Sequence, residues 1–267
     1  MRTVLIARFT TGEDPRYAVV EGEQGNGFLH VISGDPLYQT VQMTGEKVRF
    51  DDAVRLLAPV IPRSKVVAVG KNYADHVAEM ATTPGEAPPA EPLLFFKPNT
   101  SVIGPGDPIV LPRQSSNVHF EGELAIVIGK LCKDVPAERV NEVVLGYTIA
   151  NDVTARDLQK SDGQWARAKG FDTFCPLGPY LVLDTDAGDI RLTTRVNGET
   201  KQDGRTSQLI HKIPEIVAYV SAAFTLLPGD VILTGTPAGV GPLVAGDRVE
   251  VEIEGMGVLS NPVVSRD

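Results

Sequence analysis

Residues 118–129 read VHFEGELAIVIG, and this stretch sets the expectations for both the fold and the site. Its second half is an unbroken apolar run that is typical of a buried strand. Because side chains alternate along a strand, Glu121 and Glu123 should share one face. Two carboxylates leading into a buried strand repel each other and lose hydration. A bound cation would relieve both costs, and ligands made of oxygen alone favour Mg²⁺ or Mn²⁺ over zinc.

A third carboxylate, Asp152, ends the mainly apolar run VVLGYTIAND at residues 143–152. A charge at the mouth of so apolar a strand is a candidate metal ligand. The Glu-x-Glu spacing also fits an exposed strand face, and the residues alone leave both interpretations open.

Short strand candidates surround this stretch, and turn signals rich in Gly and Pro separate them. The dipeptide Asn197-Gly198 predicts a hairpin turn, and three Gly-Asp pairs before apolar runs predict further turns. Strands outnumber helices and do not alternate with them, which argues against a doubly wound sheet. We therefore expect a β-rich α+β protein built as a mixed β-sandwich or roll. The strand candidates are residues 3–9, 17–22, 28–33, 65–70, 101–104, 108–111, 123–129, 143–152, 180–183, 191–200, 231–235 and 248–255.

Three helices and a domain division are predicted around these strands. Residues 51–60 read as a short helix within a small N-terminal α+β domain over residues 1–61, which leaves residues 62–267 as the catalytic domain. Thr154 and Asp157 resemble a capping box that opens a helix at TARDLQK. Pro214 opens the third predicted helix, which has apolar residues at helical spacing.

A second polar group lies in GKNYADHVAEM, residues 70–80. On a helix His76 and Glu79 would share a face, and a carboxylate can hold an imidazole in one tautomer. The other ring nitrogen would then be free to deprotonate water. The following residues, 81–92, are rich in Pro and predict a lid. A solvated helical turn beside a loop explains the same residues equally well. His119, beside the glutamates, is expected to support or pack against the site.

The composition argues against a nucleic-acid-binding protein and against a membrane protein. The chain has 267 residues and a formal charge of −9, with 25 Lys and Arg against 34 Asp and Glu. It has no dense basic cluster, so nucleic acid is not expected as a partner. No apolar stretch approaches the length of a membrane span, and the first residues look like a strand and not a signal peptide. Cys132 and Cys175 lack metal-ligand spacing, so we expect buried free thiols and a cytoplasmic protein.

The sequence resembles the fumarylacetoacetate hydrolase superfamily over residues 62–263. Six motifs carry the resemblance in order: VGKNYADHVAEM, PLLFFKPNTSVIGPGD, VHFEGELAIVIG, GYTIANDVTARDLQ, KGFDTFCPLGPY and VILTGTPAGVG. The resemblance implies the family's mixed β-roll around a central metal, usually in a homodimer. It also implies metal ligation by Glu121, Glu123 and Asp152.

The same resemblance implies roles for other residues. Lys169 corresponds to the lysine that contacts the bound substrate, and His76 with Glu79 corresponds to a water-activating pair on a lid helix. Gln159, Thr234, Gly235 and Thr236 fall where members contact a substrate carboxylate. Apart from the resemblance, Lys71 and Arg156 are expected to help Lys169 offset the negative charge of the substrate, and Tyr73 is a further expected substrate contact.

A 2-oxo acid can bind such a cation through its carboxylate and its keto oxygen, and a metal-bound enolate then forms. We therefore expect a metal-dependent enzyme that cleaves a C–C bond, by acylpyruvate hydrolysis or by oxaloacetate-type decarboxylation. Isomerisation of a 5-carboxymethyl-2-hydroxymuconate or 2-hydroxyhepta-2,4-diene-1,7-dioate type of diacid, as in aromatic catabolism, is the alternative. A non-catalytic metal-binding β protein is the alternative of another class. The GTPAGVG segment lacks the Lys-Ser/Thr ending of a phosphate-binding loop.

Overall fold

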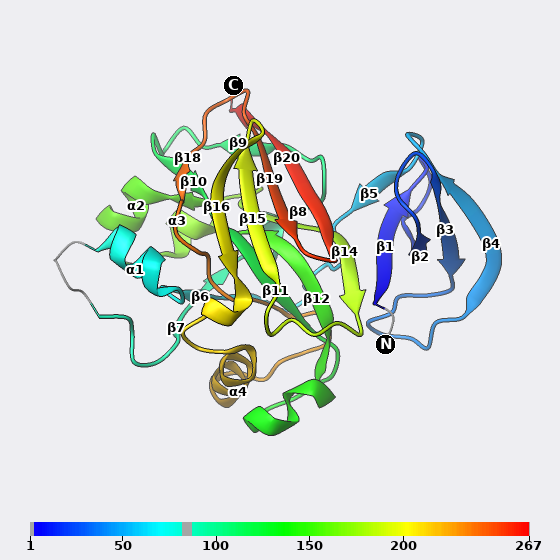
Figure 1. Cartoon of the computed structure of the whole chain (residues 1–267), viewed down its shortest axis with the longest axis horizontal. Coiled ribbons are helices and arrows are strands. Elements are labelled where there is room, and N and C mark those ends of the chain that lie inside the picture. Colours follow the sequence, from blue (N-terminus) through cyan, green and yellow to red (C-terminus); the bar gives the residue numbers. More distant parts are fainter. Residues whose placement is uncertain (1–2, 82–86, 267) are drawn as a thin grey trace.

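Strands dominate the computed structural model, which describes residues 3–81 and 87–266 (Figure 1). The predicted β-rich α+β architecture is therefore confirmed. The largest sheet has twelve strands: β1 (Val4–Thr10), β2 (Arg16–Glu21), β3 (Gly27–Ile32), β4 (Met43–Phe50), β5 (Arg55–Leu57), β6 (Val66–Gly70), β7 (Leu93–Lys97), β8 (Val102–Ile103), β11 (Gly122–Ile128), β12 (Val144–Asn151), β14 (Cys175–Leu183) and β17 (Val231–Leu233).

The order across this sheet is β4-β3-β2-β1-β14-β12-β11-β17-β6-β7, with β5 paired to β1 and β8 paired to β14. Most neighbours are antiparallel, whereas β17 with β6 and β14 with β8 are parallel. Strand β11, which follows the two glutamates, therefore lies inside the sheet between β12 and β17. All seven of its residues are buried, as its apolar sequence predicted.

Two smaller sheets complete the strand structure. A five-stranded sheet runs in the order β16-β15-β19-β20-β9 and a three-stranded sheet in the order β13-β10-β18. The Asn197-Gly198 turn joins β15 to β16 as predicted, with φ of 52° and 82° at these residues. The bounds of these strands are β9 (Ile109–Leu111), β10 (Val118–Phe120), β13 (Thr154–Ala155), β15 (Arg191–Val196), β16 (Glu199–Arg205), β18 (Gly241–Pro242), β19 (Arg248–Ile253) and β20 (Gly257–Ser265).

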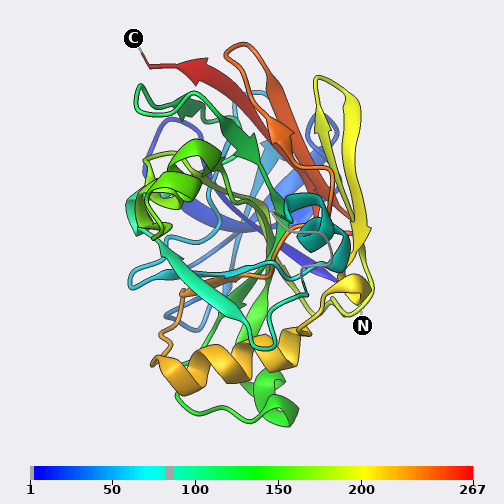
Figure 2. The ribbon, with the colours of Figure 1, turned by 90° about the vertical axis from the view of Figure 1, so that its left-hand side faces the viewer.

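Apolar side chains fill both faces of β11. Leu124 and Ile126 join a core cluster with residues of β19, β20 and α4 (Ile213–Ala223). Ala125 and Val127 join a second cluster with residues of β14 and β17. The large sheet is thus covered on one side by the five-stranded sheet and α4, as Figures 1 and 2 show. Burial on both faces fixes the register of β11, and with it the direction of the residues before it.

The remaining helices are short. They are α1 (Ala74–Met80), α2 (Arg156–Ser161), α3 (Ala166–Gly170) and three 3₁₀ turns at Asn99–Ser101, Ala137–Glu142 and Thr206–Gln208. Helix α4 follows the prediction, with a proline in its first turn and Ile216, Val217 and Val220 buried. In the described part of the chain, no helix has the length and apolar character needed to cross a membrane.

One helix prediction and one capping prediction are wrong, whereas the helix predicted at TARDLQK is confirmed as α2. Residues 51–60 do not form a helix, because residues 55–57 form β5 and pair with β1 instead. Val54 is buried in the cluster that those N-terminal strands share, so pairing and burial outweigh a short helical pattern. Thr154 does not cap α2, since it lies on β13 and its hydroxyl donates to the carbonyl of Asp152. Ala155 is the N-terminal cap residue, without a side-chain cap.

The N-terminal strands lie to one side of the body and have their own apolar cluster, with Phe9, Leu29 and Phe50 fully buried (Figure 1). They are nevertheless continuous with it, because β1 pairs with β14 from Val4 opposite Leu183 onward.

Gly122 lies where β11 begins, against the five-stranded sheet. A Cβ at this position would overlap the hydroxyl oxygen of Thr194 and would lie 3.0 Å from Cγ1 of Val251. We expect Gly122→Ala to lower the free energy of unfolding by about 1–3 kcal/mol, because the neighbouring side chains must move to admit the methyl group. Urea unfolding followed by circular dichroism measures this loss.

Gly188→Ala is the matched control. Gly188 is exposed, and a Cβ there would meet only the end of the Asp186 side chain, at 3.2 Å. Its free energy of unfolding should stay within about 0.5 kcal/mol of the wild-type value. Equal losses in the two variants would contradict the proposed close packing at Gly122.

Candidate functional site

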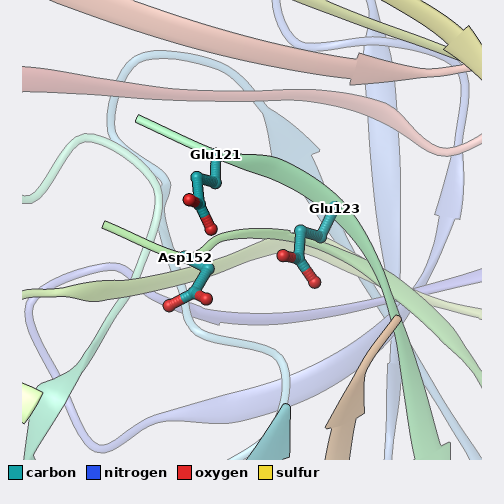
Figure 3. Close-up of side chains that lie close together, drawn as sticks. All are labelled: Glu121, Glu123 and Asp152. Atoms are coloured by element: carbon teal, nitrogen blue, oxygen red, sulfur yellow. The ribbon is translucent and has the colours of Figure 1, made fainter. Parts of the chain in front are cut away.

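Three buried carboxylates converge at one edge of β11. One oxygen from each of Glu121, Glu123 and Asp152 can be chosen so that all three lie within 4.8 Å of one another (Figure 3). Their residues are between 0% and 4% exposed. Figure 3 shows the two glutamates pointing from one chain segment toward the aspartate on the neighbouring one. This is the acidic set that the sequence predicted.

The register of two neighbouring strands brings these residues together. Gly122 pairs with Asn151, so Glu121 and Asp152 lie opposite each other at the next step of the antiparallel ladder. The amide of Asp152 donates to the carbonyl of Glu121 at 2.8 Å, and the Asn151 side chain accepts from the amide of Glu121 at 2.9 Å. These bonds fix the backbone on both sides of the cluster.

Cationic side chains contact two of the three carboxylates. Lys169 Nζ lies 2.7 Å from Glu121 Oε2 and 2.6 Å from Asp152 Oδ2. Arg156 forms a short ion pair with Glu121 Oε1, and Lys97 Nζ lies 2.6 Å from Asp152 Oδ1. The structure therefore places the predicted Lys169 and Arg156 directly at the acidic cluster.

Lys97 is a residue of this site that sequence reasoning missed. It ends β7 and is 1% exposed. The available signal was a lone lysine closing the apolar run LLFF, inside a motif that the family resemblance already contained. A lysine is almost never fully buried without a partner, so its position predicted a buried carboxylate nearby.

The carboxylates differ in how easily they ionise. Burial raises the pKa of Glu121, but the Arg156 guanidinium and the Lys169 ammonium outweigh it and hold that pKa well below its usual range. Burial and then the charges of Asp152 and Glu121 raise the pKa of Glu123 well above its usual range. Glu123 accepts one hydrogen bond, at 2.7 Å, from the amide of Gly235. Burial lowers the pKa of Lys169, yet the two carboxylates that it contacts raise it overall.

This donor set fits a hard divalent cation. All three groups offer oxygen, all are buried, and Glu123 has no cationic side chain of the described residues in contact with it. A divalent ion held by the three carboxylates would supply that missing charge, which is the usual reason for such a cluster.

A cavity of about 420 Å³ opens beside the cluster. The predicted residues on its wall are Lys71, His76, Glu121, Arg156, Gln159 and Lys169. Its other lining residues were not predicted as site residues; they are Gly70, Met80, Asn117, Asp157, Lys160 and Trp165. Trp165 packs edge-on against Phe95, with ring centroids 5.3 Å apart. A Cβ at Gly70 would lie 2.7 Å from the Trp165 ring, so glycine is needed there.

The pair on α1 has the predicted geometry. Nδ1 of His76 lies 3.1 Å from Oε2 of Glu79, and the amide of Gly239 donates to the same carboxylate at 3.0 Å. A carboxylate only accepts hydrogen bonds, so Nδ1 carries the proton and Nε2 of a neutral ring is left as the base. His76 is 6% exposed and lies on the cavity wall.

Other predicted residues lie away from the cavity wall. Tyr73 is buried and borders a different hollow beside Pro237. The hydroxyls of Thr234 and Thr236 donate to backbone carbonyls of residues 124 and 122, so they tie the loop to β11. The backbone amide of Gly235 donates a hydrogen bond to the carboxylate of Glu123. These residues therefore support the acidic cluster from behind.

His119 is the remaining candidate near the cluster. Its Nε2 lies 2.9 Å from Oδ1 of Asn117, and burial followed by the charge of Arg156 lowers its pKa to about 4. A neutral, packed histidine agrees with the supporting role expected. Part of the predicted lid, residues 82–86, lies outside the described residues. Cys175 is buried, which raises its pKa to about 12 and leaves no thiolate for catalysis.

Comparison with known proteins identifies the family. The family described as "Fumarylacetoacetate (FAA) hydrolase C-terminal" matches residues 65–264, and "Rv2993c-like, N-terminal" matches residues 5–59. Protein Rv2993c of Mycobacterium tuberculosis is 55% identical over 267 residues, covering 98% of each chain. The human mitochondrial oxaloacetate tautomerase FAHD2A is 47% identical over 254 residues, covering 91% of this chain and 78% of its own.

Solved structures of similar proteins point to the same family. A 5-carboxymethyl-2-hydroxymuconate delta-isomerase from Mycobacterium smegmatis is 51% identical with a TM-score of 0.89, covering 98% of this chain and all of its own. A fumarylpyruvate hydrolase from Pseudomonas aeruginosa, in complex with Mn²⁺ and pyruvate, is 36% identical with a TM-score of 0.71. That match covers 79% of this chain and 92% of the hydrolase. With a family match over most of its length and relatives above half identity, the chain belongs to the fumarylacetoacetate hydrolase superfamily, as its motifs predicted.

Proposed function

We propose that the protein is a metal-dependent enzyme that acts on a small 2-oxo acid through its enolate. The observation that carries this proposal is the buried set Glu121, Glu123 and Asp152 beside a cavity whose wall holds His76. These three carboxylates would hold Mg²⁺ or Mn²⁺. When bound, the cation would supply Lewis-acid stabilisation for negative charge that develops on a substrate oxygen. A related fumarylpyruvate hydrolase, solved with Mn²⁺ and pyruvate, supports this choice of ion and substrate class.

Protein groups at the cavity would bind and orient the substrate. Arg156 and Lys169 line the cavity and are cationic, so they would attract the substrate carboxylate and stabilise an enolate oxygen. Gln159 accepts a hydrogen bond from Arg156 at 2.9 Å and holds its guanidinium in place. Lys71 also lines the cavity. Tyr73 and residues 234–236 would act as supports behind it.

His76 would move the protons. Its Nε2 can take a proton from water, and the hydroxide then adds to the distal carbonyl of an acylpyruvate. The C–C bond breaks, its electron pair enters the pyruvate enolate, and a proton returned to carbon completes pyruvate and the released acid. Loss of CO₂ from oxaloacetate gives the same enolate without a nucleophile. We propose these two C–C cleavages as the primary activity.

Proton transfer without cleavage is the second candidate. Relatives at 47% and 51% identity carry the names oxaloacetate tautomerase and delta-isomerase, and both names describe movement of a proton next to a carbonyl. The same His76 and Glu79 pair would serve that reaction. A domain division near residue 61, a homodimer and a cytoplasmic location remain predictions.

Glu123→Gln tests the metal site. The amide removes a ligand charge while keeping the size, so Mn²⁺ should no longer stabilise the protein. In the wild type, Mn²⁺ at one hundred times its Kd should add about 2.7 kcal/mol to the free energy of unfolding. Thermal unfolding with and without Mn²⁺ measures both responses. We also expect Glu121→Ala and Asp152→Ala to abolish turnover of every 2-oxo acid.

Glu142→Gln is the control for the metal test, since Glu142 is an exposed glutamate that pairs with Arg139 and does not line the cavity. Its response to Mn²⁺ should equal that of the wild type. The metal proposal fails if Glu123→Gln keeps the full response.

His76→Ala tests the division of labour. Hydrolysis of acetylpyruvate should fall by about a hundredfold or more, because it needs a base to activate water. Decarboxylation of oxaloacetate should fall by less than about tenfold. Pyruvate release measures both reactions, and the absorbance of the oxaloacetate enol measures tautomerisation in the same samples.

His30→Ala serves as the control because it removes a second histidine that is paired with a glutamate, Glu21, at 2.6 Å and away from the cavity. It should leave all three rates unchanged. Equal losses of hydrolysis and decarboxylation in His76→Ala would refute the proposed roles. Loss of tautomerisation with no cleavage by the wild type would favour the second candidate.

A further inference from the structure

Lys97 lies beneath the acidic cluster and not on the cavity wall. Its ammonium contacts three acceptors: Oδ1 of Asp152 at 2.6 Å, the carbonyl of Lys169 at 2.5 Å and the carbonyl of Val153 at 3.3 Å. All three ammonium hydrogens can therefore be used by the protein. A lysine placed in this way touches no bound ligand, so it can act on one only through its charge or through the residues that it holds.

The charges around the cluster sum to zero. Glu121, Glu123 and Asp152 contribute three negative charges when ionised, and the cations that contact them within the described chain are Lys97, Arg156 and Lys169. A divalent cation held by the carboxylates would bring the sum to +2. Without Lys97 the sum would be +1. The attraction for a ligand depends on the product of the two charges, and burial weakens solvent screening.

We propose that Lys97 is a specificity-determining residue that makes the loaded site select dianionic ligands over monoanionic ones. The favoured class is a carboxylate with a second, adjacent negative oxygen, as in the enolate of a 2-oxo acid. This inference rests on the proposed function, because it requires a divalent cation at the three carboxylates. The charge of Lys97 repels the divalent cation and attracts the dianion. Removing that charge should therefore strengthen the binding of the cation and weaken the binding of the dianion.

Lys97→Met tests this prediction, since methionine keeps much of the length and removes the charge. Isothermal titration should show Mn²⁺ binding about fivefold tighter than in the wild type. In saturating Mn²⁺, oxalate should bind about tenfold weaker and oxamate only about threefold weaker. Oxalate and oxamate have nearly the same size and carry two charges and one charge, respectively. A residue that only braces the fold would weaken the binding of Mn²⁺ and of oxalate together.

Lys65→Met is the matched control. Lys65 forms a partly buried ion pair with Asp230 at 2.6 Å, and the backbone carbonyl of Asp230 accepts from the amide of Ile128, at the opposite end of β11 from Glu123. The variant removes the same charge from the residue before β6, and its affinities for Mn²⁺, oxalate and oxamate should match those of the wild type.

Two further measurements cover the case in which Lys97→Met does not fold. Lys97→Gln keeps a hydrogen-bond donor without the charge, and it should give the same opposite shifts. In the wild type, oxalate should bind at least about tenfold tighter than oxamate. Equal binding of these two anions, or parallel weakening of Mn²⁺ and oxalate in a Lys97 variant, would overturn the inference and leave the proposed function standing. Failure of the wild type to bind Mn²⁺ would overturn both.

Discussion

Burial of three carboxylates in one place is the constraint on which the rest of the site depends. Desolvation and mutual repulsion oppose their ionisation, and both raise the pKa of Glu123. The chain offsets these costs with cations from three separate elements: Lys97 from β7, Arg156 from α2 and Lys169 from α3. Helices α2 and α3 are too short to be stable alone, so tertiary contacts hold them, among them the ion pairs of Arg156 and Lys169 with Glu121.

Local patterns explain what the sequence could predict. The two glutamates, Asp152 and the helix of His76 and Glu79 were readable because each signal spans a few residues. The three Gly-Asp turns were readable for the same reason. In each of them the aspartate carboxylate accepts from the amide three residues earlier, at 2.9 Å for Asp107 and 2.8 Å for Asp230 and Asp247. Such contacts need no knowledge of the remaining chain.

Contacts between residues far apart in the chain explain what the sequence alone could not predict. Lys97 meets Asp152 from 55 residues away, so its apolar neighbours can signal burial but cannot identify its partner. Residues 55–57 became a strand because β1 offered an edge to pair with, although their pattern alone favoured a helix. Thr234 and Thr236 were predicted as substrate contacts, yet their hydroxyls donate to backbone carbonyls of β11, those of Leu124 and Gly122 respectively. In each case a partner distant in sequence decides the outcome.

One loop connects the acidic cluster to the proposed base. The amide of Gly235 donates to Glu123, and four residues later the amide of Gly239 donates to Glu79, which orients His76. Gly239 has φ of 99°, and a Cβ there would overlap the carbonyl of Lys201, so no other residue fits without a shift of the backbone. Any movement of this loop therefore changes the cluster and the base together.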